Sequence, residues 1–294
     1  MNLNNYPLWT AVVTPFLEDG SVDYRSLEAL LHEQEEADNA IVILGSTGEA
    51  LNLDMEEKKE ILKFTLGLKL KVPVMAGVGG INLRETKEWI QYLETLTLHA
   101  YLLVTPLYAK PGKFGQYEWF KALLDISTRP CMLYNVPGRT AVSMNFEAVA
   151  MLKDHPRFWA IKEASGSVFD FKRYQEAAPK AAMFSGDDSM TPVFCSLGAK
   201  GLVSVASNAW PKETHEYVRQ CLAQKLQDTE LWKECSDSLF IASNPVPVKA
   251  LLHYLKRIKT NIMRAPLDHR DLKDIKPVTI AHESIQGWFK DQVK

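Results

Sequence analysis

The chain has 294 residues, of which 46% are hydrophobic and 24% charged, and a globular chain of this length can bury a large core. Its 34 Lys and Arg residues against 36 Asp and Glu residues leave a formal net charge of −2, without the basic excess expected of a protein that binds nucleic acid or a membrane surface. The four cysteines show neither a CxxC pair nor zinc-type spacing, and no signal peptide or membrane-spanning run is recognisable, so we expect free thiols, no metal site and a cytoplasmic location.

Short apolar runs alternate with longer segments of helical periodicity along the first 225 residues. The first run, at 9–14, precedes a helix at 23–37 that Asp23 caps, and the second, at 40–44, precedes a helix that begins at Asp54 with a capping-box pattern. Further strands are predicted at 73–77, 100–104, 131–135, 158–161, 182–184 and 202–205. Their helices are predicted at 84–95, 117–126, 144–153, 169–177, 191–197 and 212–224.

The predicted strands are apolar on both faces, which is typical of a parallel sheet covered by helices. Eight strand–helix units of this length favour a closed (β/α)8 barrel, the TIM barrel, over an open sheet. The remaining chain shows only helical periodicity, with helices at 229–241, 247–258 and 282–292. We therefore predict an α/β protein with a catalytic barrel over residues 1–225 and a three-helix C-terminal extension over residues 226–294.

Active sites of such barrels lie at the C-terminal ends of the strands, and Lys162 follows the apolar strand at 158–161. Desolvation at that place disfavours the ammonium and favours the neutral amine that a Schiff-base lysine requires. An ion pair with Glu163 or another carboxylate at the rim explains the same position equally well. Tyr134 ends the neighbouring strand in the same way, either as a proton shuttle for an imine-forming lysine or as a core tyrosine with its hydroxyl at the rim.

Two loops at the same end of the barrel carry groups suited to a carboxylate. The segment Gly45-Ser46-Thr47-Gly48 offers backbone N–H groups and hydroxyls, although a plain strand-to-helix turn has the same composition. Arg139 follows the rigid turn Pro137-Gly138 and suits bidentate binding of a carboxylate, or else is a surface arginine. No phosphate loop, HExxH or GxSxG motif occurs, so nucleotide binding, zinc hydrolysis and triad chemistry lack support.

Five motifs in order resemble those of the dihydrodipicolinate synthase (4-hydroxy-tetrahydrodipicolinate synthase) family, which belongs to the pyruvate-dependent class I aldolases that include N-acetylneuraminate lyase. The motifs are Gly45-Ser46-Thr47-Gly48-Glu49, Tyr134-Asn135-Val136-Pro137-Gly138-Arg139-Thr140, Ile161-Lys162-Glu163-Ala164-Ser165-Gly166, Ser185-Gly186-Asp187-Asp188 and Asn244-Pro245-Val246-Pro247-Val248-Lys249. The resemblance covers nearly the whole chain. It implies the barrel, three C-terminal helices and a homo-oligomer, with a tetramer of paired tight dimers expected and a dimer as the alternative.

The resemblance also implies an activity, the condensation of pyruvate with L-aspartate 4-semialdehyde to 4-hydroxy-tetrahydrodipicolinate in lysine and diaminopimelate biosynthesis. Lys162 forms a Schiff base with pyruvate, so no metal or organic cofactor is implied. Protons pass through Tyr134, with Ser46 and a Tyr108 from the partner subunit completing the relay. The implied substrate-binding residues are Thr47 for the pyruvate carboxylate, Arg139 for the semialdehyde carboxylate, and Gly186 and Val203.

The chain departs from the family at a few positions. Ser46 stands where the synthases usually carry threonine, and Leu107 replaces a tyrosine that stacks across the tight-dimer interface in many of them. Lysine-inhibited members carry polar residues at a regulatory site where this chain has Leu51, Met55, Lys58 and Ile81, with only Glu85 kept. We therefore expect free lysine to inhibit weakly or not at all.

Two other functions fit parts of this pattern. One is a related aldolase or lyase that cleaves a 2-oxo sugar acid or 4-hydroxy-2-oxoglutarate through the same imine. The Pro-Gly-Arg sequence at 137–139 favours the synthase over it, because a guanidinium suits a second substrate that carries a carboxylate. The other is a catalytically silent barrel that only binds a metabolite, and the retained amine–phenol pair of Lys162 and Tyr134 argues against it.

Overall fold

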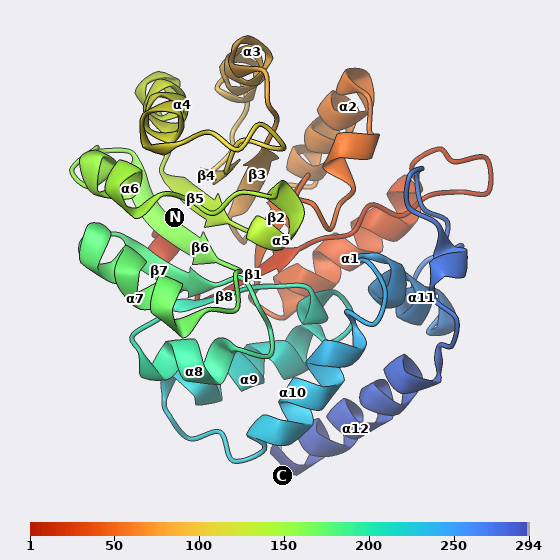
Figure 1. Cartoon of the computed structure of the whole chain (residues 1–294). Coiled ribbons are helices and arrows are strands. Elements are labelled where there is room, and N and C mark those ends of the chain that lie inside the picture. Colours follow the sequence, from red (N-terminus) through yellow and green to blue (C-terminus); the bar gives the residue numbers. More distant parts are fainter. Residues whose placement is uncertain (293–294) are drawn as a thin grey trace.

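Eight short strands pair in parallel and in chain order, and the last pairs with the first to close a barrel (Figure 1). The structure is a computed structural model that describes residues 1–292. Its strands are β1 (Leu8–Ala11), β2 (Ala40–Ile43), β3 (Val74–Val78), β4 (Ala100–Val104), β5 (Cys131–Asn135), β6 (Phe158–Glu163), β7 (Ala182–Ser185) and β8 (Gly201–Ser204). Nearly all strand residues are buried on both faces, so the predicted (β/α)8 barrel is confirmed.

Helices cover the outside of the barrel, one or more after each strand (Figure 1). They are α1 (Tyr24–Glu36), α2 (Met55–Gly67), α3 (Leu83–Leu93), α4 (Lys113–Ile126), α5 (Pro137–Thr140), α6 (Phe146–Leu152), α7 (Val168–Ala177), α8 (Thr191–Ser196) and α9 (Pro211–Leu222). Both predicted caps are confirmed: the Asp23 side chain accepts from Ser26 N, and Asp54 and Glu57 form a reciprocal capping box. The segment expected to be a turn after β5 is instead the single-turn helix α5.

Two strands end two or more residues away from the predicted position, and both differences affect the site. Strand β6 continues through Lys162 and Glu163, because both residues stay in the ladders with β5 and β7. Strand β1 stops at Ala11, and Val13 N donates to the side chain of Asn208 instead of to a neighbouring strand. Thr14 therefore lies in the loop after β1 and not at the strand end.

Three helices, α10 (Thr229–Ser238), α11 (Val246–Tyr254) and α12 (Lys276–Gln292), form the predicted C-terminal extension. Helix α12 begins at Lys276, before the predicted start at 282. Pro277 is tolerated in its first turn, because the N–H that proline lacks would have no partner within the helix there. The Trp232 ring of α10 stacks on Tyr217 of α9 with centroids 4.1 Å apart, so the extension packs directly on the barrel. The boundary between 225 and 226 stays a prediction, and residues 293–294 of the predicted extension lie outside the described residues.

Two apolar layers fill the fold. The larger lies between the strands and the surrounding helices, and a second fills the inside of the barrel with side chains such as Trp9, Met75, Met132, Phe184 and Val203. All four cysteines are buried free thiols, as expected. In the part of the chain from 1 to 292, no helix combines the length and apolarity needed to cross a membrane.

Candidate active site

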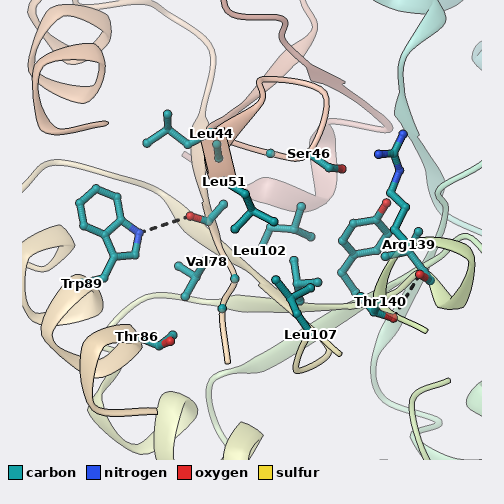
Figure 2. Close-up of a pocket in the computed structure, with 18 of the residues that line it drawn as sticks. Leu44, Ser46, Leu51, Val78, Thr86, Trp89, Leu102, Leu107, Arg139 and Thr140 are labelled. Atoms are coloured by element: carbon teal, nitrogen blue, oxygen red, sulfur yellow. Dashed lines mark hydrogen bonds between the residues drawn. The ribbon is translucent and has the colours of Figure 1, made fainter. Parts of the chain in front are cut away.

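A cavity of about 510 Å³ opens where the C-terminal ends of strands β1 to β6 meet, and it extends outward between α2 and α3 (Figure 2). Its mouth is formed by the loops after β2, β3, β4 and β5. Four of the predicted site residues line it: Ser46, Tyr134, Arg139 and Lys162. Since (β/α)8 enzymes carry their active sites at this end of the barrel, the cavity is the candidate active site.

Lys162 lies within β6, and its amine is one of the groups that line the cavity. The residue is 5% exposed, and its Nζ lies 4.2 Å from the centroid of the Tyr134 ring. Glu163 points to the other side of the strand, because successive side chains alternate, and its carboxylate accepts from Asn135 Nδ2 at 2.8 Å and Ser165 N at 2.6 Å. Within residues 1–292 no carboxylate lies within 4.0 Å of the Lys162 amine. The structure thus excludes an ion pair between Lys162 and Glu163.

Tyr134 reaches the same place from the neighbouring strand. The ladders pair Tyr134 with Lys162 and Lys162 with Phe184 of β7, so the three side chains point into the barrel at one level. Tyr134 is 5% exposed, and its aromatic face lies against the lysine amine. The structure therefore brings together the predicted amine and phenol, while their chemical roles remain predictions.

The loop after β2 presents Ser46 to the cavity, and the backbone N–H groups of Ser46 and Thr47 make no hydrogen bond within residues 1–292. Two adjacent free N–H groups of this kind can together bind an anion. The Thr47 side chain is buried and its Oγ1 accepts from Asn244 Nδ2 at 2.9 Å, so this hydroxyl faces away from the cavity. The backbone of β3 lies close to the start of this loop. The approach requires glycine at position 77, because a Cβ there would lie 2.1 Å from the Leu44 carbonyl oxygen.

Arg139 is exposed at the cavity mouth in α5 (Figure 2), and its Nη2 donates to the Asn244 carbonyl oxygen at 3.0 Å. Asn244 therefore contacts both the loop that holds Thr47 and the turn that holds Arg139. Asn244 belongs to the last of the five motifs, but no site role is predicted for it from the sequence. Its position 197 residues from Thr47 in the chain explains why local patterns could not reveal this contact.

Besides Thr47, three predicted residues do not line the cavity of their own chain. Tyr108 is 85% exposed and has φ +64°, an uncommon conformation for a bulky residue. Val203 is 1% exposed and lies in the interior core below the cavity. Gly186 lies against the stem of the lysine: a Cβ there would be 2.8 Å from Lys162 Cε and 2.7 Å from Ala164 Cβ. Gly186 therefore sets the space that Lys162 occupies.

If Lys162 forms an imine as the sequence predicts, replacing Gly186 with alanine is expected to lower the rate of that step by about 100-fold, since a shift of about 1 Å in a reacting group has effects of this size. Reduction with borohydride in the presence of a keto acid, followed by mass spectrometry over time, measures that rate. Gly287→Ala is the control, because a Cβ at that helical position meets nothing within 4 Å. Equal rates for G186A and the wild type would contradict the role assigned to Gly186.

A (β/α)8 barrel whose mouth holds a buried amine without a carboxylate partner, a phenol beside it and a site for an anion has the features of the class I aldolases, lyases that work through a lysine imine. Within residues 1–292 no group of three or more His, Cys, Asp or Glu side chains is arranged to hold a metal ion.

Comparison with known proteins narrows this class. The chain belongs to the dihydrodipicolinate synthetase family, which it matches over residues 6–279. It is 48% identical to the 4-hydroxy-tetrahydrodipicolinate synthase of Francisella philomiragia over 291 residues, 98% of each chain. The dihydrodipicolinate synthase from Acinetobacter baumannii complexed with pyruvate superposes with a TM-score of 0.90 at 35% identity, covering 96% of this chain and 99% of that one. A monomeric dihydrodipicolinate synthase variant also has a TM-score of 0.90, at 29% identity, covering 97% and 99%.

Proposed function

We propose that this chain condenses pyruvate with L-aspartate 4-semialdehyde to give 4-hydroxy-tetrahydrodipicolinate. The observation that carries the proposal is the Lys162 amine, which lines the cavity beside Tyr134 and has no carboxylate partner among residues 1–292. The synthase named above, similar over nearly the full length of both chains, supports the same assignment. The four buried free thiols agree with action in the reducing cytoplasm, where we place the protein.

The amine of Lys162 adds to C2 of pyruvate, and loss of water gives the imine. The imine withdraws electrons, so a proton leaves C3 and the resulting enamine attacks the aldehyde carbon of the semialdehyde. The amino group of that substrate then adds to C2, the ring closes, and Lys162 leaves as the free amine. Tyr134 carries protons in these steps, with Ser46 and a partner's Tyr108 completing the relay. Because the imine itself is the electron sink, the reaction needs no cofactor.

The two substrate carboxylates have separate sites in this mechanism. The free N–H groups of Ser46 and Thr47 hold the pyruvate carboxylate, and the exposed guanidinium of Arg139 holds that of the semialdehyde. Thr47 thus acts through its backbone, since its hydroxyl already bonds Asn244. Gly186 acts by holding the lysine stem, and the burial of Val203 below the cavity does not favour a direct contact of its side chain with substrate.

Borohydride reduction with pyruvate, followed by peptide mass spectrometry, tests the shared first step. A reduced pyruvyl adduct on Lys162 is expected. Turnover of L-aspartate 4-semialdehyde by the same preparation then separates the synthase from an aldolase, which would instead cleave a 2-oxo sugar acid or 4-hydroxy-2-oxoglutarate. The absence of an adduct on folded protein would overturn the proposal and favour a barrel that only binds a metabolite.

We further propose a homo-oligomer, a tetramer of tight dimers, in which Tyr108 enters the cavity of the partner subunit. Tyr108 is the most exposed large apolar side chain of the described residues, and Leu51, Ile81 and Phe114 also expose more than half of their surface, at 64%, 53% and 67%. Mixing a Lys162→Met variant with a Tyr108→Phe variant tests this, because a mixed dimer regains one complete site. A fully active protein that sediments as a monomer would contradict the proposed oligomer.

Free lysine is expected to inhibit this protein weakly or not at all. The outer part of the cavity is lined by Leu51, Met55 and Ile81, and its cation is Lys58, half-buried and without an ion pair within residues 1–292. The carboxylate kept there, Glu85, already accepts from Asn82 Nδ2 at 2.7 Å. Burial lowers the pKa of Lys58, and an ammonium entering beside it would meet repulsion. A titration of the initial rate with L-lysine measures this effect. Strong inhibition at low millimolar lysine would contradict the prediction.

A further inference from the structure

A buried ion pair joins the C-terminal extension to the loop after β2. Lys249 of α11 and Glu49 are 200 residues apart, both side chains are 0% exposed, and Nζ lies 2.8 Å from Oε1. The same ammonium donates to the Thr14 carbonyl oxygen at 3.0 Å and to the Ile262 carbonyl oxygen at 2.7 Å. All three of its protons are therefore used within the protein, and none is free for a ligand.

Such a pair needs an explanation other than stability. Burial lowers the pKa of Lys249, an effect that the Glu49 carboxylate opposes. Replacing a buried ion pair with apolar groups is often neutral or stabilising, because desolvating two charges offsets their attraction. The second Glu49 oxygen accepts from Arg264 N at 2.9 Å, so both oxygens of this carboxylate bond to residues of the C-terminal extension.

The pair holds the loop that carries Ser46 and Thr47. Glu49 has φ +54° and closes the turn by donating its N–H to the Ser46 carbonyl oxygen at 3.1 Å. At the preceding residue, Thr14 Oγ1 donates to the Gly48 carbonyl oxygen at 2.7 Å, while the Thr14 carbonyl accepts from Lys249. One ammonium thus fixes the C-terminal end of the turn, at Glu49 directly and at Gly48 through Thr14.

We propose that Glu49 and Lys249 are positioning residues, which keep the N–H groups of Ser46 and Thr47 directed at a substrate carboxylate without touching the substrate. The inference rests on the proposed function in taking that carboxylate to be the one of pyruvate. It makes the C-terminal extension part of the substrate-binding machinery, because Lys249 and Asn244 both reach the same loop from it.

The test compares Glu49→Gln and Lys249→Met with Arg257→Met. Arg257, in the segment after α11, forms an ion pair with Glu33 of α1. This pair also joins the extension to the barrel, but it does not contact the loop after β2. In E49Q and K249M the KM for pyruvate is expected to rise by about 10- to 100-fold, the effect of losing a hydrogen bond to a charged group, while the KM for the semialdehyde stays unchanged. E49Q keeps the shape of the side chain and one acceptor oxygen, so it is expected to be the milder variant. It carries the test alone if K249M does not fold.

Hydrogen exchange of peptides that cover residues 44–50 gives a readout independent of activity. Faster exchange there in E49Q and K249M, but not in Arg257→Met, is expected. An unchanged pyruvate KM with unchanged exchange, or the same changes in Arg257→Met, would overturn the inference. If the wild type failed to capture pyruvate, the proposed function would fall, whereas the exchange comparison would still decide whether the ion pair holds the loop.

Discussion

Replacing Lys162 with methionine is expected to abolish pyruvate capture and to lower turnover by at least about 10⁴-fold, because the proposed mechanism forms its imine on this amine. Methionine fills a similar volume, so the barrel interior stays packed around Phe184 and Tyr134. The loss should appear both in borohydride trapping and in the steady-state rate. It should also be independent of pyruvate concentration, since the missing group forms the covalent bond.

Lys58→Met is the matched control for this variant. Lys58 lines the same cavity and is half-buried, but it stands at the outer end between α2 and α3 and has no role in the proposed mechanism. Wild-type trapping is expected for it. A pyruvyl adduct that persists in Lys162→Met, or one found on Lys58 in the wild type, would contradict the assignment of Lys162.

Tyr134→Phe is expected to lower kcat by about 10²- to 10⁴-fold, the usual contribution of a positioned acid–base group. The ring that packs on the Lys162 amine is retained, so imine formation should slow without being lost. Exchange of the C3 protons of pyruvate with deuterated solvent, followed by NMR, isolates the proton-transfer step and should slow in parallel with turnover.

Tyr101→Phe is the control for the loss of a buried hydroxyl. Tyr101 of β4 is 0% exposed and packs in the outer apolar layer instead of lining the cavity. Activity close to that of the wild type is expected for this variant. Comparable losses in the two variants would show that the effect at Tyr134 comes from packing and not from proton transfer.

The sequence by itself determined the barrel, the order of its elements and the end at which chemistry takes place. These features follow from short-range patterns: apolar runs, helical periodicity, and caps such as Asp23 and Asp54, whose hydrogen bonds reach only three residues along the chain. The five motifs identified the residues that the cavity then brought together, among them Lys162 and Tyr134.

Only the tertiary structure decided which side of β6 each of two neighbouring residues faces. Lys162 and Glu163 are adjacent in sequence, and a pair between them was as good an explanation as a free amine. The ladder with β5 and β7 continues through both, so alternation sends the amine into the cavity and the carboxylate to Asn135 and Ser165. Register depends on partners on other strands, which no local pattern contains.

The contacts of the C-terminal extension were equally out of reach of the sequence. Lys249 meets Glu49, and Asn244 meets Thr47 and Arg139, across 105 to 200 residues of chain. Such contacts exist because closing the barrel and packing α11 on its mouth bring distant segments to one place, and burial there favours polar groups that find a partner. The sequence therefore named the residues that are proposed to react, whereas the packing of the whole chain decided what holds them in position.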